Sequence, residues 1–450
     1  MSLYTRFIAN LVFPIQERLK QHDTVRRKRE LEKSQWLSTE QILALQQDKL
    51  QAFIRNISAT VPYYRQLFSS LGITAADIKT VEDLTQLPFL TKAVIREKFD
   101  QLTADTSSGL KRFNTGGSSG QPLIFMLGNE RVSHDVAAKW RATRWWGVDI
   151  GDKEIVAWGS PIELGAQDKM RLLRDALFRS TLIPAFDLTE EKLLAFLAQI
   201  RQSRPKMLFG YPSVFHLLAK TAEKHQINMQ QLGIKVVFVT SERLYPYQRE
   251  LISQIFNAPV ANGYGGRDAG FIAHECPHGS LHLSAEDIIV EIVSPDGKVL
   301  PVGEKGEIVV THLATSEFPF VRYRTGDIAC LGSAPCGCGR GLPVLASVEG
   351  RSTDFVVAAD GTMMHGLALI YILRDIPGIE AFKIIQHSLS ETEVQLVWPD
   401  GPLPADITSL IQSGLQARLG AEVKININQL NEIAPEASGK YRYVISKVAS

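Results

Sequence analysis

The chain has 450 residues, and its 49 basic and 48 acidic side chains leave a formal net charge of only +1. A chain of this length can bury a large apolar core in two or three domains. The balanced charge argues against a nucleic-acid-binding protein and implies no polybasic membrane patch. Four cysteines are too few for a disulfide scaffold, so we expect a cytoplasmic protein.

Residues 1–105 have a mostly helical pattern. The sequence Ser38 to Gln41 predicts a capping box that begins a helix. The apolar stretch Phe7 to Ile15 is too short to span a bilayer, and it lacks the basic flank and cleavage site of a signal peptide. We expect a helix packed on the domain there, in preference to an interfacial helix, and no integral membrane segment.

The stretch Asn114 to Pro122, NTGGSSGQP, lies between two short apolar runs and predicts a strand, a hydroxyl-rich loop and a second strand. Glycine backbone N–H groups and the hydroxyls of Thr115, Ser118 and Ser119 can converge on an anion. The spacing is not that of a Walker loop, because Gln121 and Pro122 follow the last glycine. A flexible surface hairpin is the plainer interpretation of this loop alone.

Helical and strand-like segments alternate after this loop, which indicates α/β layers with largely parallel strands. From Asp287 the pattern changes to antiparallel strands joined by the turn SPDGK. From Gly350 it predicts β-α-β-β-α-β, the size of a separate small domain. The predicted fold class is α/β, with a large multi-layer N-terminal domain at residues 1–349, including its helical first part, and a smaller α+β C-terminal domain at residues 350–450.

Four more motifs follow in the chain: NGYGGRDAG (262–270), RYRTGD (322–327), GRSTD (350–354) and ASGKYR (437–442). A glycine-rich segment at a strand end is a common ligand site in α/β sheets, although a tight turn is the plainer interpretation. In RYRTGD the carboxylate suits a ribose diol, and the arginines can face phosphate. Surface salt bridges and a solvated lysine are the corresponding alternatives for these last motifs.

These five motifs in this order resemble the adenylate-forming (acyl-CoA synthetase) superfamily, and more closely the phenylacetate–coenzyme A ligase family. The nearest similarity is to the branch associated with capsular polysaccharide biosynthesis genes. It extends over almost the whole chain, including VPYYRQLF, VEDL and LPFLTK early and GKYRYVIS late. The resemblance implies an AMP-forming acid–thiol ligase with a mobile C-terminal domain.

The resemblance also implies roles for particular residues. The family's phosphate loop matches Thr115, Gly117, Ser118, Ser119 and Gly120. Its adenine and α-phosphate motif matches Tyr264, Gly265 and Arg267, and ends at Asp268 as the magnesium ligand. Its ribose aspartate falls on Asp327, its hinge residue on Asp354 and its adenylation lysine on Lys440, and Arg351 is a further candidate for binding the nucleotide.

The sequence departs from the family pattern at several of these positions. Gly116 replaces a serine or threonine, and no lysine follows Gly120. Arg267 replaces a threonine and is available to the α-phosphate. Asp268 replaces a glutamate and is one methylene shorter, so its metal contact can run through water.

The chemistry requires these groups, because attack of a carboxylate on the α-phosphate of ATP brings anions together. The acyl-adenylate must then meet a thiol, and a domain swing about Asp354 would remove Lys440 and open the thiol path. We expect coenzyme A as the acceptor. An amine, a hydroxyl or a carrier-protein thiol in polysaccharide or secondary-metabolite biosynthesis is the alternative, and a non-catalytic binding protein is disfavoured.

A second signal is the cysteine pattern. Cys276 and His282 lie in CPHGSLH, and Cys336 and Cys338 in CGCG, which fits a structural zinc with three thiolates and one histidine. His278 is the rival for the histidine place. Buried free thiols are the alternative.

The candidates for an acyl pocket that stacks on an aromatic acid are Trp145, Trp146, Trp158 and Tyr211. Aromatic residues at helical spacing are more often part of the hydrophobic core. The expected cofactors and partners are ATP, Mg²⁺, structural Zn²⁺, coenzyme A and a small carboxylic acid, and we allow for a homodimer. The identity of the acid stays open.

Overall fold

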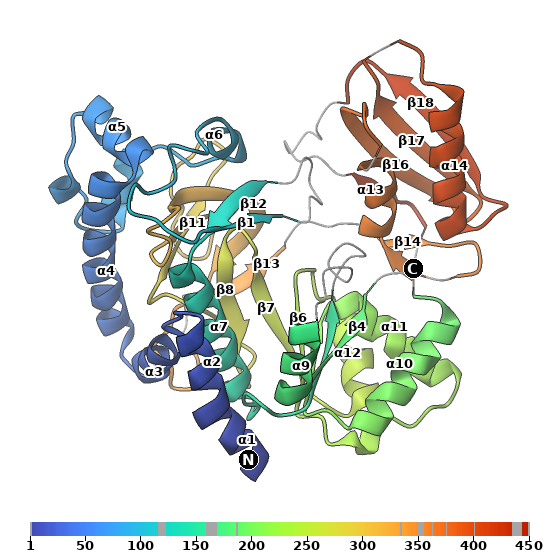
Figure 1. Ribbon diagram of the computed structural model, residues 1–450, viewed down its shortest axis with the longest axis horizontal. Helices are drawn as coiled ribbons and strands as arrows, with labels where there is room; N and C mark the ends of the chain where they lie inside the picture. Colours follow the sequence, from blue (N-terminus) through green and yellow to red (C-terminus); the bar gives the residue numbers. More distant parts are fainter. Residues whose placement is uncertain are drawn as a thin grey trace.

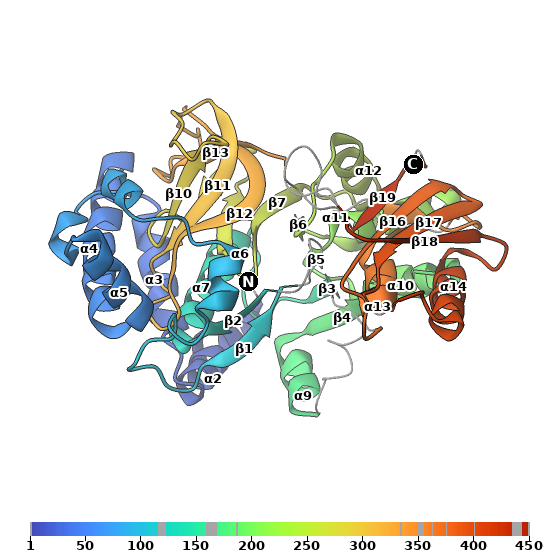
Figure 2. The same ribbon diagram turned by 90° about the horizontal axis from the view of Figure 1, so that it is seen from above.

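The computed structural model describes residues 2–115, 123–158, 169–185, 188–333, 335–349, 355–361, 363–374, 376–399, 401–433 and 443–448. Helices from the start of the chain lie on one side of the molecule, a large twisted sheet crosses its middle, and a smaller α+β unit lies at the opposite end (Figure 1). The second view shows the same order of parts from above (Figure 2). Among the described residues, no helix combines the length and apolar character needed to cross a bilayer.

The first part of the chain is helical. Its longer helices are α3 (Thr24–Ser34), α4 (Thr39–Thr60) and α5 (Pro62–Leu71). The shorter helical elements are α1 (Leu3–Phe7), η1 (Ile8–Val12), α2 (Phe13–Leu19), η2 (Ala75–Asp77), η3 (Glu82–Gln86) and α6 (Lys92–Glu97). The predicted capping box is present, because the Ser38 side chain accepts from Gln41 N–H and the Gln41 side chain accepts from Ser38 N–H. This reciprocal pair begins α4 where the sequence placed it.

The hairpin around the hydroxyl-rich loop consists of β1 (Lys111–Asn114) and β2 (Ile124–Leu127). The two strands pair antiparallel, from Lys111 opposite Leu127 to Asn114 opposite Ile124. This arrangement confirms the predicted strands on both sides of the loop. Helix α7 (Asn129–Trp145) follows.

One half of the central sheet is parallel. It contains β3 (Glu154–Trp158), β4 (Ser180–Pro184), β5 (Met207–Gly210), β6 (Val236–Thr240) and β7 (Val260–Gly266). Its helical elements are α9 (Lys169–Phe178), α10 (Glu190–Ser203), α11 (Pro212–Lys224), η4 (Gln230–Leu232) and α12 (Pro246–Phe256). Every residue of β5 and β6 is buried, as expected for central parallel strands with covered faces.

The other half of the sheet is antiparallel. It contains β8 (Gly270–Glu275), β9 (Leu281–Leu283), β10 (Ile288–Val293), β11 (Lys305–His312), β12 (Phe320–Leu331) and β13 (Val344–Val348). The full strand order is β10-β11-β12-β13-β9-β8-β7-β6-β5-β3-β4.

The change of strand direction comes earlier than predicted. The sequence placed it at Asp287, whereas β7 and β8 already form an antiparallel hairpin with Gly266 opposite Gly270. An antiparallel partner needs only a short turn, while a parallel one needs a long crossover. The segment 262–266 is therefore strand, and the expected loop is reduced to the turn at residues 267–269.

The C-terminal unit has its own sheet of order β18-β17-β16-β19 and its own apolar core, which includes Ile384, Leu396 and Leu415. Its strands are β14 (Phe355–Val357), β15 (Met363–His365), β16 (Ala381–Ser388), β17 (Glu391–Val397), β18 (Lys424–Leu430) and β19 (Val444–Ser446). Its helices are α13 (Leu367–Arg374) and α14 (Ala405–Leu419). The α/β fold with a large N-terminal and a smaller C-terminal domain is therefore confirmed.

Candidate active site

The stem of the hydroxyl-rich loop is closed at Thr115. Thr115 N–H donates to Leu123 O at 3.0 Å, and Leu123 N–H donates to Thr115 Oγ1 at 3.0 Å. These bonds extend the β1–β2 pairing by one residue and fix where the loop begins. Several predicted site residues lie outside the described residues. They are the rest of the phosphate loop, the nucleotide-binding candidate Arg351, the hinge residue Asp354 and the lysine Lys440; the loop residues are Gly117, Ser118, Ser119 and Gly120.

The structure brings the tyrosine–glycine motif and the RYRTGD motif together. The Tyr264 hydroxyl on β7 donates to Asp327 Oδ2 on β12 at 2.9 Å. The Tyr323 hydroxyl on β12 donates back to Asp268 Oδ2 at 2.6 Å. Two contacts in opposite directions therefore join segments more than 50 residues apart. The sequence predicted Tyr264, Asp268 and Asp327 as site residues, but it gave no role to Tyr323.

A bulge in β12 positions Asp327. Between the pairs Arg324–Val309 and Ile328–Glu307, β12 has more residues than β11. Gly326 has φ of +80°, and Thr325 Oγ1 accepts the Asp327 N–H at 3.1 Å. Glycine adopts this left-handed conformation without strain, and a bulge re-aims the side chain that follows it. The sequence TGD is therefore the local reason that the Asp327 carboxylate leaves the strand pairing.

Close backbone approach explains the glycine in Tyr264-Gly265. A Cβ on Gly265 would lie 2.2 Å from the carbonyl oxygen of Gly270. Gly270 itself has φ of +88°, and a Cβ there would meet His312 Nε2 at 2.8 Å and Arg131 Nη2 at 2.9 Å. The turn that carries Asp268 can therefore form only with glycine at its base.

Arg131 of α7 supports the same turn, and sequence reasoning missed it. Its guanidinium donates to the carbonyl oxygens of Arg267 and Asp268, each at 3.3 Å, and its Nε donates to Asp135 Oδ2 at 3.0 Å. The Arg131 side chain is buried. A single arginine in a helical pattern gives no sequence signal of a contact with a turn 136 residues away.

Three buried histidines, His134, His274 and His312, lie near Arg131 or Arg141. Burial lowers the pKa of His274 to about 3, and the nearby Arg141 and His134 add to the effect. Burial also lowers the pKa of His312 well below its usual value, with Arg131 as the next cause. Both rings are therefore neutral at neutral pH, and His312, which lies against Gly270, borders the turn without adding charge.

The ligand atoms of His134, Asp135 and His312 lie within 4.8 Å of one another, a spacing that a metal ion could bridge. Two observations argue against a metal there. His312 Nδ1 accepts the Ala314 N–H at 3.2 Å, so the proton of the neutral ring is on Nε2, the atom that faces Asp135 at 3.9 Å. Arg131 already supplies the positive charge beside Asp135.

Arg267 lies on the exposed part of the turn. Desolvation by the surrounding protein lowers its pKa, and the Tyr371 phenol on α13 acts in the opposite direction. An arginine remains charged in spite of such a shift. The guanidinium is therefore a fixed cation beside the Tyr264 and Asp268 positions, near the first helix of the C-terminal unit.

The prediction that the RYRTGD arginines face phosphate is wrong. Arg322 is buried and forms a bidentate ion pair with Glu291, at 2.9 Å and 3.1 Å. Its Nη1 also donates to Leu87 O at 2.8 Å. Arg324 donates to Glu307 from its Nε at 2.9 Å. Both guanidinium groups are occupied by carboxylates within the sheet, so they hold β12 in place instead of binding a ligand.

Asp268 retains capacity for a cation. Its Oδ2 accepts from Tyr323, and its Oδ1 accepts from Ala269 N–H at 3.1 Å. Each carboxylate oxygen has two lone pairs, so one on each oxygen stays available. The residue therefore fits a magnesium ligand as the sequence predicted, directly or through water.

The four residues predicted for zinc come together in space. Cys276 Sγ lies 3.6 Å from Cys336 Sγ, and Cys338 Sγ lies 3.3 Å from His282 Nε2. All four ligand atoms lie within 4.8 Å of one another. Cys276 directly follows β8, His282 lies on β9, and the other two cysteines lie between β12 and β13. Tetrahedral ligands about 2.3 Å from a zinc ion are about 3.8 Å apart, so the spacing fits.

His282 also has the tautomer that a metal ligand needs. Its Nδ1 lies 3.0 Å from Leu342 O, so Nδ1 carries the proton and Nε2 presents a lone pair to the thiols. His278, the rival, is not among the clustered ligands. Cys330 lies outside the set, as predicted, and donates to Leu331 O at 3.4 Å.

These neighbouring thiols can all be deprotonated at once only if a cation is bound between them. Burial raises the pKa of Cys276 to about 11. Burial alone would also raise the pKa of Cys336, but hydrogen bonds from Ser280, Cys338 and Cys276 lower it. Adjacent thiolates are stabilised by a bound metal, because coordination deprotonates thiols. The donor set therefore suits a zinc ion.

The aromatic residues proposed for the acyl pocket separate into two groups. Trp145 Nε1 donates to Gln35 Oε1 at 2.7 Å, and Trp146 Nε1 donates to Glu275 O at 3.0 Å, so both have structural partners. Trp158 stacks on Tyr211, with ring centroids 4.7 Å apart. These two rings follow the carboxyl ends of β3 and β5, the edge where open α/β sheets bind ligands.

Comparison with known proteins agrees with this geometry. Residues 111–316 match the model of the AMP-binding enzymes, and residues 356–447 match the CapK C-terminal domain. Protein CapK of Staphylococcus aureus is 23% identical over 411 residues, which cover 90% of both chains. Phenylacetate-coenzyme A ligase of Thermus thermophilus is 25% identical over 373 residues, 80% of this chain and 82% of the relative.

A solved structure supports the fold. The structure of 2-hydroxyisobutyryl-CoA ligase with its acyl-AMP and coenzyme A, in the thioesterification state, has a TM-score of 0.67. It is 21% identical and covers 92% of this chain and 91% of its own. Two matched segments and relatives that span nearly the whole chain point to one family. Over most of its length the chain is therefore similar to the AMP-binding, adenylate-forming enzymes, and in particular to CapK and the phenylacetate–coenzyme A ligases.

Proposed function

We propose that this chain is an AMP-forming acid–thiol ligase, which activates a carboxylic acid with ATP and passes the acyl group to coenzyme A. The observation that carries the proposal is the double contact between the motifs, Tyr264 to Asp327 and Tyr323 to Asp268. It puts a carboxylate suited to a ribose diol and a carboxylate suited to a metal on one surface. The relatives named as coenzyme A ligases support the acceptor.

In the first half-reaction, a carboxylate oxygen of the acid attacks the α-phosphorus of ATP and pyrophosphate leaves. Asp327 would accept hydrogen bonds from the ribose hydroxyls, and Arg267 would hold α-phosphate charge. A magnesium ion bound at Asp268 would supply positive charge to the phosphate oxygens. We assign the β- and γ-phosphates to Thr115, Gly117, Ser118, Ser119 and Gly120, and contact with the adenine and α-phosphate to Tyr264 and Gly265.

In the second half-reaction, the thiol sulfur attacks the acyl carbonyl carbon and AMP leaves. We assign to Lys440 the neutralisation of charge in the first step only. Movement of residues 350–450 against residues 1–349, about a hinge at Asp354, would then exchange Lys440 for the thiol. We assign Arg351 to nucleotide binding.

We also propose a structural zinc ion held by Cys276, His282, Cys336 and Cys338. All four positions of a tetrahedral site are filled by protein ligands, which is typical of structural and not of catalytic zinc. The site would fasten the β8–β9 connection to the loop before β13. Trp158 and Tyr211 are our candidates for contact with an aromatic acid. We place the protein in the cytoplasm, and a homodimer is our proposal for its assembly.

Pyrophosphate release across a panel of aromatic and aliphatic carboxylic acids, with and without coenzyme A, tests the function. We expect at least one acid to release pyrophosphate, and coenzyme A to convert it to a thioester with AMP. Pyrophosphate release with transfer only to an amine, hydroxyl or carrier protein would favour the alternative acceptor. No release with any acid, in a folded and ATP-binding protein, would contradict the proposal.

Lys440→Ala then separates the half-reactions. A positioned cation contributes about 3 kcal/mol to such a transition state, so acyl-adenylate formation should fall roughly a hundredfold or more. Given pre-made acyl-adenylate, the variant should still transfer the acyl group at near the wild-type rate. Asp354→Pro, which stiffens the hinge, should show the reverse pattern. Equal slowing of both steps by Lys440→Ala would refute a mechanism in which the C-terminal domain moves between the two half-reactions.

A further inference from the structure

An exposed apolar stripe runs along the first helical rod of the chain. Leu3, Phe7, Leu11, Ile15 and Leu19 recur at every fourth residue through α1, η1 and α2, and their side chains are 50% to 84% exposed. A strict four-residue repeat drifts about 40° per step around a uniform α-helix. The π-helical turn at Ile8–Val12 is wound more widely, and so works against this drift. The five side chains therefore stay on one side of the rod.

The opposite side of this rod is packed on the protein. Ile8, Ala9 and Phe13 are buried and form a small core with Ile150. The Phe13 ring contacts that of Phe178, with centroids 6.3 Å apart. The rod is thus held in place by one face, which confirms the expected packing on the domain, while its other face stays uncovered among the described residues.

The apolar exposure is concentrated in this region. Helix α9 adjoins the rod, because the Tyr4 hydroxyl donates to Leu177 O at 2.8 Å, and it exposes Leu172, Leu173 and Leu177. These two elements hold eight of the seventeen exposed large apolar side chains in the described chain. Single exposed apolar residues are normal, whereas a cluster of this kind marks an interaction surface.

The charge beside the stripe is positive. Residues 2–33 contain eight basic and four acidic side chains, a net charge of +4 in a chain whose total is +1. On the rod itself the exposed charges are Arg6, Arg18 and Lys20, and the one acid, Glu17, is buried and contacts Lys20 and His22. The exposed charge of the rod is therefore entirely cationic.

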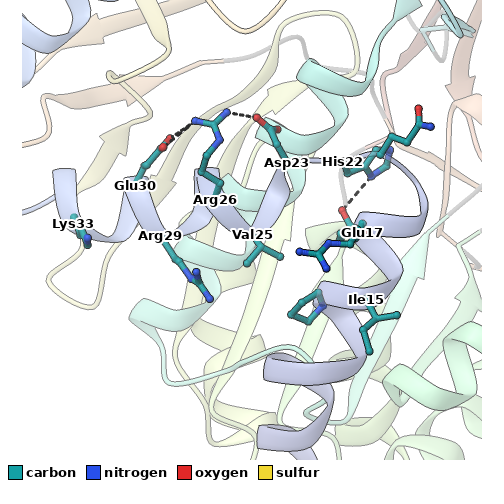
Figure 3. A pocket seen from close by; sticks show the side chains of 12 residues that line it. Ile15, Glu17, His22, Asp23, Val25, Arg26, Arg29, Glu30 and Lys33 are labelled. Atoms are coloured by element: carbon teal, nitrogen blue, oxygen red, sulfur yellow. Dashed lines mark hydrogen bonds and ion pairs between the residues drawn. The ribbon is translucent and has the colours of Figure 1, made fainter.

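A cavity of about 730 Å³ lies between α2 and α3, directly beside the stripe. Figure 3 shows Ile15 on one helix and Arg29 on the other, among the residues that line this hollow. Arg26 is paired with Asp23 and Glu30, whereas Arg18, Arg29 and Lys33 have no carboxylate partner among the described residues. A second cavity, of about 340 Å³, lies between α3 and α4. Neither cavity is at the candidate active site.

We propose that this face docks the protein on the surface of an anionic lipid bilayer, without crossing it. The stripe from Leu3 to Leu19 would enter the boundary between headgroups and acyl chains, and Arg18, Arg29 and Lys33 would contact lipid phosphates. A helix with an apolar face and a basic flank is the pattern of an interfacial helix. Each cation near an anionic surface strengthens binding, and salt weakens it. The proposal does not depend on the ligase reaction.

Cosedimentation with vesicles tests it. The full chain should bind vesicles of equal parts phosphatidylglycerol and phosphatidylcholine, bind phosphatidylcholine alone more weakly, and be released by salt. Leu11→Glu with Ile15→Glu should lower binding by about tenfold or more. The matched control, Leu43→Glu with Leu410→Glu, changes helix leucines of similar exposure elsewhere and should bind like wild type.

The charge is tested separately. Arg18→Gln with Arg29→Gln should lower binding to the anionic vesicles by about tenfold and leave binding to phosphatidylcholine unchanged, whereas Arg55→Gln with Arg201→Gln should change neither. A wild-type protein that stays in the supernatant with anionic vesicles, or control variants that lose as much binding, would overturn the proposal. A dimer in sedimentation velocity that Leu11→Glu with Ile15→Glu abolishes would assign the face to a second copy instead.

Discussion

Two clusters in this protein hold metal-ligand side chains at the same spacing, yet they differ in chemistry. The atoms of Cys276, His282, Cys336 and Cys338 lie within 4.8 Å of one another, and so do those of His134, Asp135 and His312. In the first cluster, the histidine directs a lone pair inward. In the second, the proton of His312 points inward and Arg131 occupies the place of a cation. Tautomer and local charge, more than distance, decide which cluster suits a metal.

Removal of the thiol ligands should have the largest effect. Cys336→Ser should lose about one bound zinc per chain and lower the free energy of unfolding by about 5 kcal/mol or more, because metal binding is coupled to folding. Metal analysis of the purified protein and thermal melting measure these two effects. Cys330→Ser, the same change outside the cluster, should keep its zinc, and so should His312→Gln. Loss of zinc from His312→Gln, or absence of zinc from the wild-type protein, would contradict the assignment of zinc to the cysteine cluster.

Replacement of Arg131 should have the next largest effect on stability, and it should also affect ATP binding. Arg131→Met leaves the Asp135 carboxylate without its ion pair and should cost about 3 kcal/mol in the free energy of unfolding. It should also raise KM for ATP about tenfold, because the turn carrying Asp268 loses its support.

The control for this change lies on the same helix. Arg141 is equally buried and pairs with Glu286 at 2.6 Å, away from the turn. Arg141→Met should cost similar stability and leave KM for ATP unchanged. Equal KM values for the two variants would mean that Arg131 has only a structural role.

A smaller effect is expected from the buried neutral histidines, as a loss of folding stability when the pH is lowered. The pKa of His274 is about 3 in the folded chain and ordinary in the unfolded chain, so the unfolded state binds the proton first as pH falls. Between pH 6.5 and 5 this one group should remove about 2 kcal/mol of stability. His274→Phe should flatten the stability curve over that range by the same amount. His216, whose pKa burial lowers to about 4, should keep its own contribution. An unchanged curve would show that His274 is already charged in the folded protein.

The cluster of Cys276, His282, Cys336 and Cys338 could be predicted because its members occur as two short local patterns. The five ordered motifs likewise indicated the family, and the alternation of helical and strand-like segments indicated the α/β fold. Arg131 and Tyr323 could not be predicted, because each acts on a turn that is distant in sequence and depends on how α7 and β12 lie against it. The wrong role of Arg322 has a similar cause, since Glu291 faces it only after β10, β11 and β12 are aligned. Local residue types identify chemistry, whereas cross-sheet partners need the assembled sheet.

The turn between β7 and β8 also has a consequence for the order of folding. It lies where the two halves of the central sheet meet, and the antiparallel half is built mainly from neighbouring strands with short connections. The parallel half needs crossovers through whole helices, which close larger loops and pair more slowly. The contact of Tyr264 on β7 with Asp327 on β12 joins the two halves, so it needs both of them in place. In refolding experiments, recovery of nucleotide binding should therefore lag behind recovery of β structure.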